Sequence, residues 1–178
     1  MSGSTTPNDT AAETGAFPSL RGRLNELAAL AVGHLRGEGK NAALAESCTG
    51  GLIAAVMASV PGASQALHSS AVVYQTEAKT TLLGLDAAFV QRFGAVSEEV
   101  TRALAEAART KSGADIGLAV TGWAGPSGGS VRDPVGTCYI AVTDGTSTDC
   151  RRVVIPGDRA CVRETAAALA LDWLCRIS

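Results

Sequence analysis

The stretch Asn41-Ala-Ala-Leu-Ala-Glu-Ser-Cys-Thr-Gly-Gly51 is the part of the sequence that indicates the fold most directly. Its first five residues, Asn41 followed by the apolar run Ala42–Ala45, predict a buried strand. The polar turn Glu46–Gly51 follows at once, and the apolar residues from Leu52 to about Ser59 predict a helix. A strand that passes through a tight turn into a helix is where active-site atoms often gather. We therefore expect an α/β domain with functional groups in this turn.

The segments around this unit predict further helices and strands. Apolar residues recur every three or four positions from Leu20 to about Arg36, which predicts an amphipathic helix. After Ser59, the sequence predicts a strand at 66–74, helices at 77–83 and 86–92, and a Ser97-capped helix to about 111. A strand at 115–120, hairpin strands at 135–143 and 148–155, and an Asp158-capped helix follow. This order predicts a three-layer α/β/α sandwich with a mixed, mostly parallel sheet of about five strands.

Residues 1–19 differ from the rest of the chain in composition. They are rich in Ser, Thr, Gly, Pro, Asn and Asp and bury too little apolar surface to offset the entropy of ordering. We expect a disordered tail there. Residues 20–178 contain neither an internal repeat nor a linker, so they form one domain in this interpretation.

The composition limits the classes of function. The 178 residues carry 15 basic and 17 acidic side chains, a formal charge of −2. No overall positive field would hold nucleic acid or an anionic membrane, and we expect a small-molecule substrate. Five widely spaced cysteines without a C-x-x-C pair indicate neither a zinc site nor a disulfide framework. The N-terminus lacks a signal-peptide pattern, which favours a cytoplasmic protein.

The turn after the first predicted strand offers a candidate nucleophile. Ser47 lies before two adjacent glycines and a helix start, where backbone amides could stabilise an oxyanion. Two alternatives remain at this point: Ser47 or Thr49 could merely cap the helix, and Cys48 could be the nucleophile instead. Only two histidines, His34 and His68, are present, and neither belongs to an obvious catalytic motif.

Two further segments carry candidate chemistry. A lysine in a water-poor pocket has its pKa lowered, so Lys79 could act as a base beside Tyr74, although an exposed lysine is the ordinary alternative. After the strand at 115–120, the loop Thr121–Ser130 contains Gly122, Gly125, Gly128 and Gly129, which would let backbone amides approach a phosphate or an amide oxygen. The loop is not a P-loop, because it lacks G-x-x-x-x-G-K-[ST].

The sequence contains six segments that together resemble the CinA C-terminal domain family. In chain order they are Ala45-Glu-Ser-Cys-Thr-Gly-Gly51, Pro61-Gly-Ala-Ser64, Val72-Val-Tyr-Gln-Thr-Glu-Ala-Lys79 with Leu82-Leu-Gly84, Gly94-Ala-Val-Ser97, Thr121-Gly-Trp-Ala-Gly-Pro126 with Gly128-Gly129 and Pro134-Val-Gly-Thr137, and Gly157-Asp-Arg159 with Val162-Arg163. They cover about residues 20–175 in the family's order.

The resemblance implies a hydrolase that converts nicotinamide mononucleotide to nicotinic acid mononucleotide and ammonia, without a metal or redox cofactor. It implies Ser47 as nucleophile and Lys79 with Tyr74 as proton-handling partners. Oxyanion donors are then expected among the amides of Thr49, Gly50 and Gly51 and at Thr121. Relatives commonly pair, so the resemblance also implies a homodimer.

The chain departs from the family pattern in three places. Ser69-Ser70 stand where the family usually has a glycine shortly before the tyrosine, Thr76 stands where asparagine is usual, and Trp123 stands where a smaller aliphatic residue is usual. These changes leave open a second interpretation, in which the domain is a nucleotide-binding or protein-interaction module with weak turnover. A generic serine esterase is disfavoured, because the G-x-S-x-G elbow is missing.

Overall fold

The computed structural model describes residues 20–177, and the tail predicted at residues 1–19 lies outside the described residues. The elements occur in the order α1 (Leu20–Gly37), β1 (Ala42–Glu46), α2 (Leu52–Ala58), a 3-10 helix η1 (Ala63–Gln65), β2 (Leu67–Val72), α3 (Thr76–Thr81), α4 (Ala87–Phe93), α5 (Glu98–Ser112), β3 (Ile116–Gly122), β4 (Thr137–Thr143), β5 (Thr148–Val154) and α6 (Arg159–Leu174).

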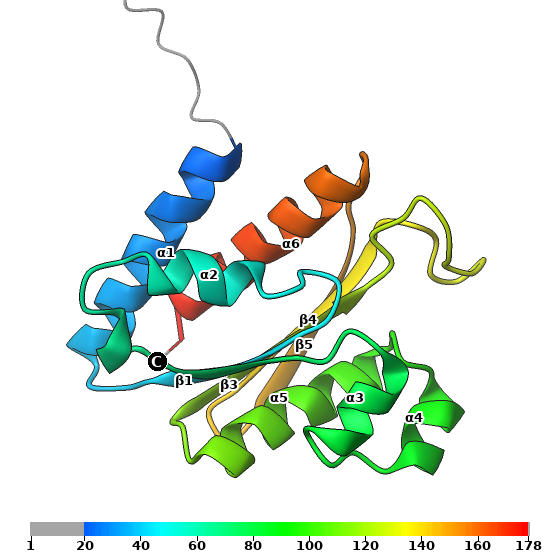
Figure 1. The fold of residues 1–178 in the computed structure, drawn as a ribbon, viewed down its shortest axis with the longest axis horizontal. Helices are drawn as coiled ribbons and strands as arrows, with labels where there is room; N and C mark the ends of the chain where they lie inside the picture. The colour runs from blue at the N-terminus through cyan, green and yellow to red at the C-terminus, as the bar shows by residue number, and fades with distance from the viewer. Residues whose placement is uncertain (1–19, 178) are drawn as a thin grey trace, which may run out of the picture.

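The predicted three-layer sandwich is confirmed. Helices α1, α2 and α6 cover one face of the sheet, and α3, α4 and α5 cover the other (Figure 1). The strand order is β2-β1-β3-β4-β5. Strands β2, β1 and β3 are parallel, and β4 runs antiparallel to both β3 and β5, so β4 alone opposes the other four strands.

Several strand boundaries differ from the prediction; β3, for example, runs to Gly122 rather than ending at Val120. The strand expected at 66–74 covers only 67–72, and the strand expected from Val135 begins at Thr137. Gly136 has φ 95°, and its amide donates to the Trp123 carbonyl at 2.7 Å. The backbone therefore turns sharply at Gly136, and regular pairing with β3 begins only after it.

The two faces of the sheet carry different side chains. Along β1, Ala42 and Leu44 pack in the core beneath α1, α2 and α6, whereas Ala43 and Ala45 pack beneath α5. This alternation is the period of two expected for a strand buried on both faces. Small residues on the second face let α5 lie close to the sheet.

Helix α5 packs closely on the sheet at Gly117 in β3. A Cβ atom added there would lie 2.1 Å from the Ala105 carbonyl oxygen of α5. We expect Gly117→Ala to lower the free energy of unfolding by about 3 kcal/mol, because the helix backbone itself must move. Urea unfolding followed by circular dichroism would measure this change.

Gly33→Ala is the matched control, since nothing lies within 4 Å of its added Cβ, and it should stabilise α1 by about 0.5–1 kcal/mol. Equal effects of the two substitutions would contradict the packing argument.

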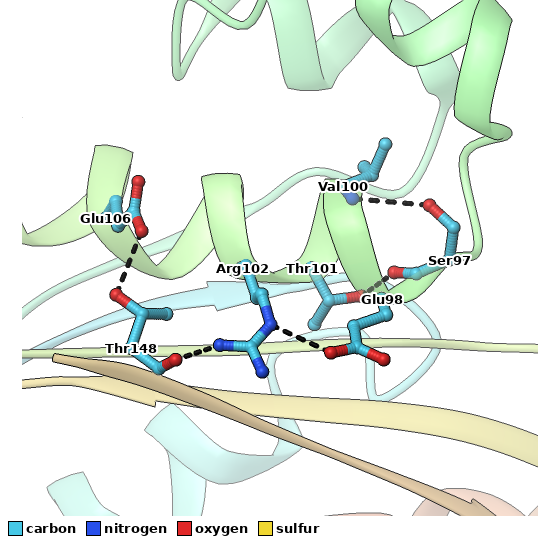
Figure 2. A network of polar contacts seen from close by, with 7 residues as sticks. All are labelled: Ser97, Glu98, Val100, Thr101, Arg102, Glu106 and Thr148. Carbon is cyan, nitrogen blue, oxygen red and sulfur yellow. Dashed lines mark hydrogen bonds and ion pairs between the residues drawn. The ribbon is translucent and has the colours of Figure 1, made fainter.

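Helix α5 is also fixed by polar contacts (Figure 2). The predicted cap is confirmed: the Ser97 hydroxyl accepts a helix amide at 3.2 Å, and the Thr101 hydroxyl donates back to the Ser97 carbonyl at 2.6 Å. Arg102 donates to the Thr148 carbonyl, and the Thr148 hydroxyl donates to the Glu106 carboxylate at 2.9 Å. The helix is thereby tied to the first residue of β5.

Candidate active site

A cavity of about 230 Å³ lies at the carboxyl ends of β1 and β3. These two strands are neighbours and run parallel, so the segments that leave them emerge at the same edge of the sheet. The chain leaves β1 through α2 on one face and leaves β2 through α3–α5 on the other (Figure 1). Such a reversal of connection is where ligands bind in open α/β sheets.

The turn after β1 is held by backbone bonds and by one buried carboxylate. The Ser47 amide donates to the Val120 carbonyl at 3.0 Å, which ties the turn to β3. The fully buried Glu46 carboxylate accepts the amides of Ile53 at 3.1 Å and Ala54 at 2.8 Å. The N-cap residue of α2 is Gly51, without a side-chain cap. The alternative in which Ser47 or Thr49 caps the helix is therefore wrong.

Lys79 lies buried beside the turn. Its side chain is 1% exposed, so the alternative of an ordinary surface lysine is also wrong. Its Nζ donates to the Val73 carbonyl at 2.9 Å and lies 3.5 Å from the Ser47 Oγ. Burial lowers the pKa of Lys79, because a desolvated ammonium is unfavourable, and the negative groups of Cys48 and Glu77 oppose this shift only in part. The arrangement places a buried amine with a lowered pKa 3.5 Å from a serine hydroxyl.

Tyr74 lines the same cavity but is bonded elsewhere. Its ring is half exposed, and its hydroxyl accepts a hydrogen bond from the Arg159 guanidinium. Arg159 also donates to the Gly125 carbonyl at 2.9 Å, so it connects the two sides of the cavity mouth. In this structure Tyr74 therefore faces Arg159 rather than Lys79.

The structure brings only some of the predicted site residues to the cavity wall. The residues that it places there are Ser47, Tyr74, Lys79, Gly122 and Gly125. Those that it places outside the lining are Thr49, Gly50, Gly51, Thr121, Gly128 and Gly129. The Gly50 amide donates to the Ser47 carbonyl at 3.0 Å, and the buried Thr121 hydroxyl bonds to Thr101 at 2.7 Å. Neither group faces a ligand in the cavity.

The loop glycines shape the wall more than they line it. A Cβ added at Gly128 would lie 2.6 Å from the Trp123 ring, so the absence of a side chain there lets this ring pack close to the loop. At Gly122, an added Cβ would meet the sulfurs of Cys138 at 2.6 Å and Cys48 at 3.0 Å. These glycines allow close packing, which is a different role from the ligand contact expected of them.

Several lining residues were not singled out as site residues from the sequence. Trp123, Thr76 and Arg159 line the cavity, as do Ala95 and Val96. The last two precede the Ser97 cap, within one of the six segments that carried the resemblance. Thr76 and Trp123 depart from the family pattern, so two of the three departures lie in the cavity wall, whereas Ser69-Ser70 in β2 do not line it.

The Cys48 thiol is a second nucleophilic group at the cavity. A hydrogen bond from the buried Cys138 thiol lowers the pKa of Cys48, although burial acts in the opposite direction. The two histidines are elsewhere: the His34 ring bonds to the Ile177 carbonyl at 2.7 Å, and His68 is exposed on β2. Histidine therefore supplies no base for either Ser47 or Cys48 in this cavity.

Two features are absent from residues 20–177. No group of three or more His, Cys, Asp or Glu side chains in this range could hold a metal ion. No helix in the same range is long and apolar enough to cross a membrane. The single chain does not test the expected homodimer, which stays a prediction.

The fold and the cavity define a class of protein: a three-layer α/β/α domain with a buried lysine against a serine at a strand-to-helix turn. Residues 24–177 match the CinA C-terminal domain, and the chain belongs to this family. The resemblance on which the sequence analysis relied is thereby confirmed.

Relatives and solved structures support this assignment. The chain is 47% identical to a CinA-like protein of Geobacter metallireducens over 141 residues, which are 79% of this chain and 34% of that protein. It therefore spans about a third of the length of such curated relatives. A CinA superfamily protein from Klebsiella pneumoniae 700603 superposes with a TM-score of 0.82 at 30% identity, covering 85% of this chain and 95% of that one. A competence/damage inducible protein from Agrobacterium tumefaciens superposes with a TM-score of 0.82 at 32% identity, covering 89% and 96%.

Proposed function

We propose that this domain hydrolyses the carboxamide of nicotinamide mononucleotide, giving nicotinic acid mononucleotide and ammonia. The observation that carries the proposal is the buried Lys79 amine 3.5 Å from the Ser47 hydroxyl in a cavity. An amide is a poor electrophile with a basic leaving group, so its hydrolysis needs a nucleophile and a group that both accepts and returns a proton. A neutral lysine can perform both steps.

The chemistry follows from these two side chains. The Lys79 amine accepts the Ser47 proton while Ser47 Oγ attacks the carboxamide carbon, which forms a tetrahedral oxyanion. The protonated Lys79 then donates its proton to the departing nitrogen. Ammonia leaves, and the acyl group remains bonded to Ser47 Oγ. Water, deprotonated by Lys79, releases the acid and restores Ser47. The 3.5 Å separation in the free enzyme is expected to shorten once substrate excludes water.

Arg159 supports a substrate that carries a phosphate. It lines the cavity at the mouth, whereas Arg163 lies behind the turn and binds its carbonyls. A guanidinium is a good phosphate partner, because its planar donors match phosphate oxygens. Arg159 is therefore the proposed phosphate contact, and Tyr74 positions it.

A substrate series tests the proposal. Incubation with nicotinamide mononucleotide should release ammonia and nicotinic acid mononucleotide in equal amounts. Nicotinamide riboside should react less well, because it lacks the phosphate, and free nicotinamide least of all. Ammonia can be followed by a coupled assay and the nucleotides by chromatography.

The alternative function is a binding module without efficient turnover. This alternative is favoured by Thr76 and Trp123, which both line the cavity and depart from the family pattern. Binding of nicotinamide mononucleotide by calorimetry, with no ammonia released over many hours, would favour the module and contradict the amidase. Hydrolysis of simple esters in preference to the nucleotide would contradict both.

A further inference from the structure

Arg163 in α6 reaches the outer side of the nucleophile turn. Its Nη2 donates to the Thr49 carbonyl at 2.9 Å, and its Nε donates to the Cys48 carbonyl at 3.2 Å. The side chain is half buried, and no ion pair with a carboxylate is found for it among residues 20–177. The guanidinium is rigid and planar, so two bonds to successive carbonyls fix the orientation of both peptide groups.

Because peptide groups are planar, the bonds of Arg163 to the two carbonyls also fix the direction of the N–H groups on the opposite side of the turn. A trans peptide is planar, and its N–H points away from its C=O. The Cys48 carbonyl shares a peptide with the Thr49 amide, so a bond that holds this carbonyl toward Arg163 aims the Thr49 N–H away from Arg163. The next amide, that of Gly50, is already bonded to the Ser47 carbonyl at 3.0 Å. Although Thr49 is not one of the cavity's lining residues, its amide is therefore the donor of this turn whose direction Arg163 sets.

The peptide between Cys48 and Thr49 lies at the cavity, since Cys48 is one of the lining residues beside Ser47. The backbone amides of Cys48 and Thr49 contribute to the lowered pKa of the Cys48 thiol, which agrees with this placement. An oxyanion formed on a carbon bonded to Ser47 Oγ would develop in the same region. The first amides of α2 are not available for this purpose, since Glu46 binds those of Ile53 and Ala54.

We infer that Arg163 is a positioning residue of the proposed hydrolase, which aims and polarises the Thr49 amide as an oxyanion donor. Its positive charge on the carbonyl side of the turn draws electron density toward the carbonyl oxygens and makes the opposite N–H a stronger donor. Arg163 touches no reacting atom in this assignment. The inference rests on the proposed function and adds the donor and the residue that orients it.

The test compares Arg163→Lys and Arg163→Ala with Arg176→Ala. Arg176 is the matched control, because it follows the same helix, is exposed, and pairs only with Asp172 among residues 20–177. We expect kcat for nicotinamide mononucleotide to fall by about 10–50-fold in both Arg163 variants, less than the ~10²–10³-fold cost of removing an oxyanion donor directly. KM should change little, since the oxyanion exists only in the transition state. Arg176→Ala should keep the wild-type rate.

Two readouts separate positioning from a purely structural role. The apparent pKa of the pH profile should be unchanged in the Arg163 variants, because the surroundings of Lys79 are unchanged. Added guanidinium should partly restore kcat in Arg163→Ala but not in Arg163→Lys, where the lysine chain fills the site. Raised KM with normal kcat, or a loss explained by a lower melting temperature alone, would overturn the inference. Inactive wild-type protein would instead contradict the proposed function.

Discussion

Replacing Lys79 by methionine is expected to lower kcat/KM for nicotinamide mononucleotide by about 10³-fold, within the usual contribution of a positioned acid–base group. Methionine has nearly the length of lysine but no proton to exchange. The buried site is already dry, with Lys79 1% exposed, so an apolar side chain fits it. Ammonia release at saturating and limiting substrate would measure the change. The matched control is Lys111→Met on the exposed side of α5, which should keep the wild-type rate.

The pH dependence gives a second test of Lys79. The neutral amine is the active form, so kcat/KM should rise as the pH increases through the lowered pKa of Lys79. It should level off below about 10.4, the value for an exposed lysine. A rate that still rises in the range of an ordinary lysine would contradict a buried base.

The same shift has a consequence for stability, with a definite sign. The folded-state pKa of Lys79 is lower than the unfolded one, so the unfolded chain binds more protons between the two values. The wild type should therefore gain stability relative to Lys79→Met as the pH rises through this window. This gain in the stability of the wild type is smallest at pH values below the folded-state pKa of Lys79. It is complete at pH values above the unfolded-state pKa. Urea midpoints for the two proteins across this range would check the sign.

Replacing Ser47 by alanine is expected to reduce turnover by about 10⁴-fold or more, because it removes the atom that attacks the carboxamide. Ser47 is nearly buried and its backbone bond to Val120 is unaffected by the change, so the protein should remain folded. Mass spectrometry of wild-type protein quenched during turnover should find the acyl group on Ser47. Ser47→Ala should carry none.

Cys48 provides the critical comparison for Ser47. Both side chains line the cavity, and the pKa of Cys48 is lowered by its contact with Cys138. If Ser47 is the nucleophile, Cys48→Ala should retain far more activity than Ser47→Ala, and the acyl group should stay on Ser47. An acyl group on Cys48, or a greater loss in Cys48→Ala, would move the assignment to the thiol.

The local sequence pattern was sufficient to predict the order of the helices and strands. The strand, polar turn and helix at 41–59 depend on neighbouring residues, and so do the caps at Ser97 and Asp158. Boundaries near Gly136 were misplaced, because its positive φ follows from contacts with Trp123 and Ile155 that no short window contains.

The contacts within the site depended on distant parts of the chain. Sequence placed the Glu46–Gly51 turn at a helix start but could not indicate that Glu46 binds the helix amides. Thr121 opens a glycine-rich loop in the sequence, yet its hydroxyl faces Thr101 in α5. Arg163 is separated from Cys48 by more than a hundred residues, so its bonds to the turn exist only when α6 packs beside α2.

The sequence by itself determined the α/β class, the position of the strand-to-helix turn, and the family to which the chain belongs, because these are recorded in local periodicity and motif order. Only the tertiary structure decided that Lys79 is buried against Ser47, that Tyr74 faces Arg159, and that six predicted ligand residues lie outside the cavity lining. The physical reason is that desolvation and hydrogen-bond direction depend on what surrounds a group in three dimensions, and those surroundings come from elements remote in the chain.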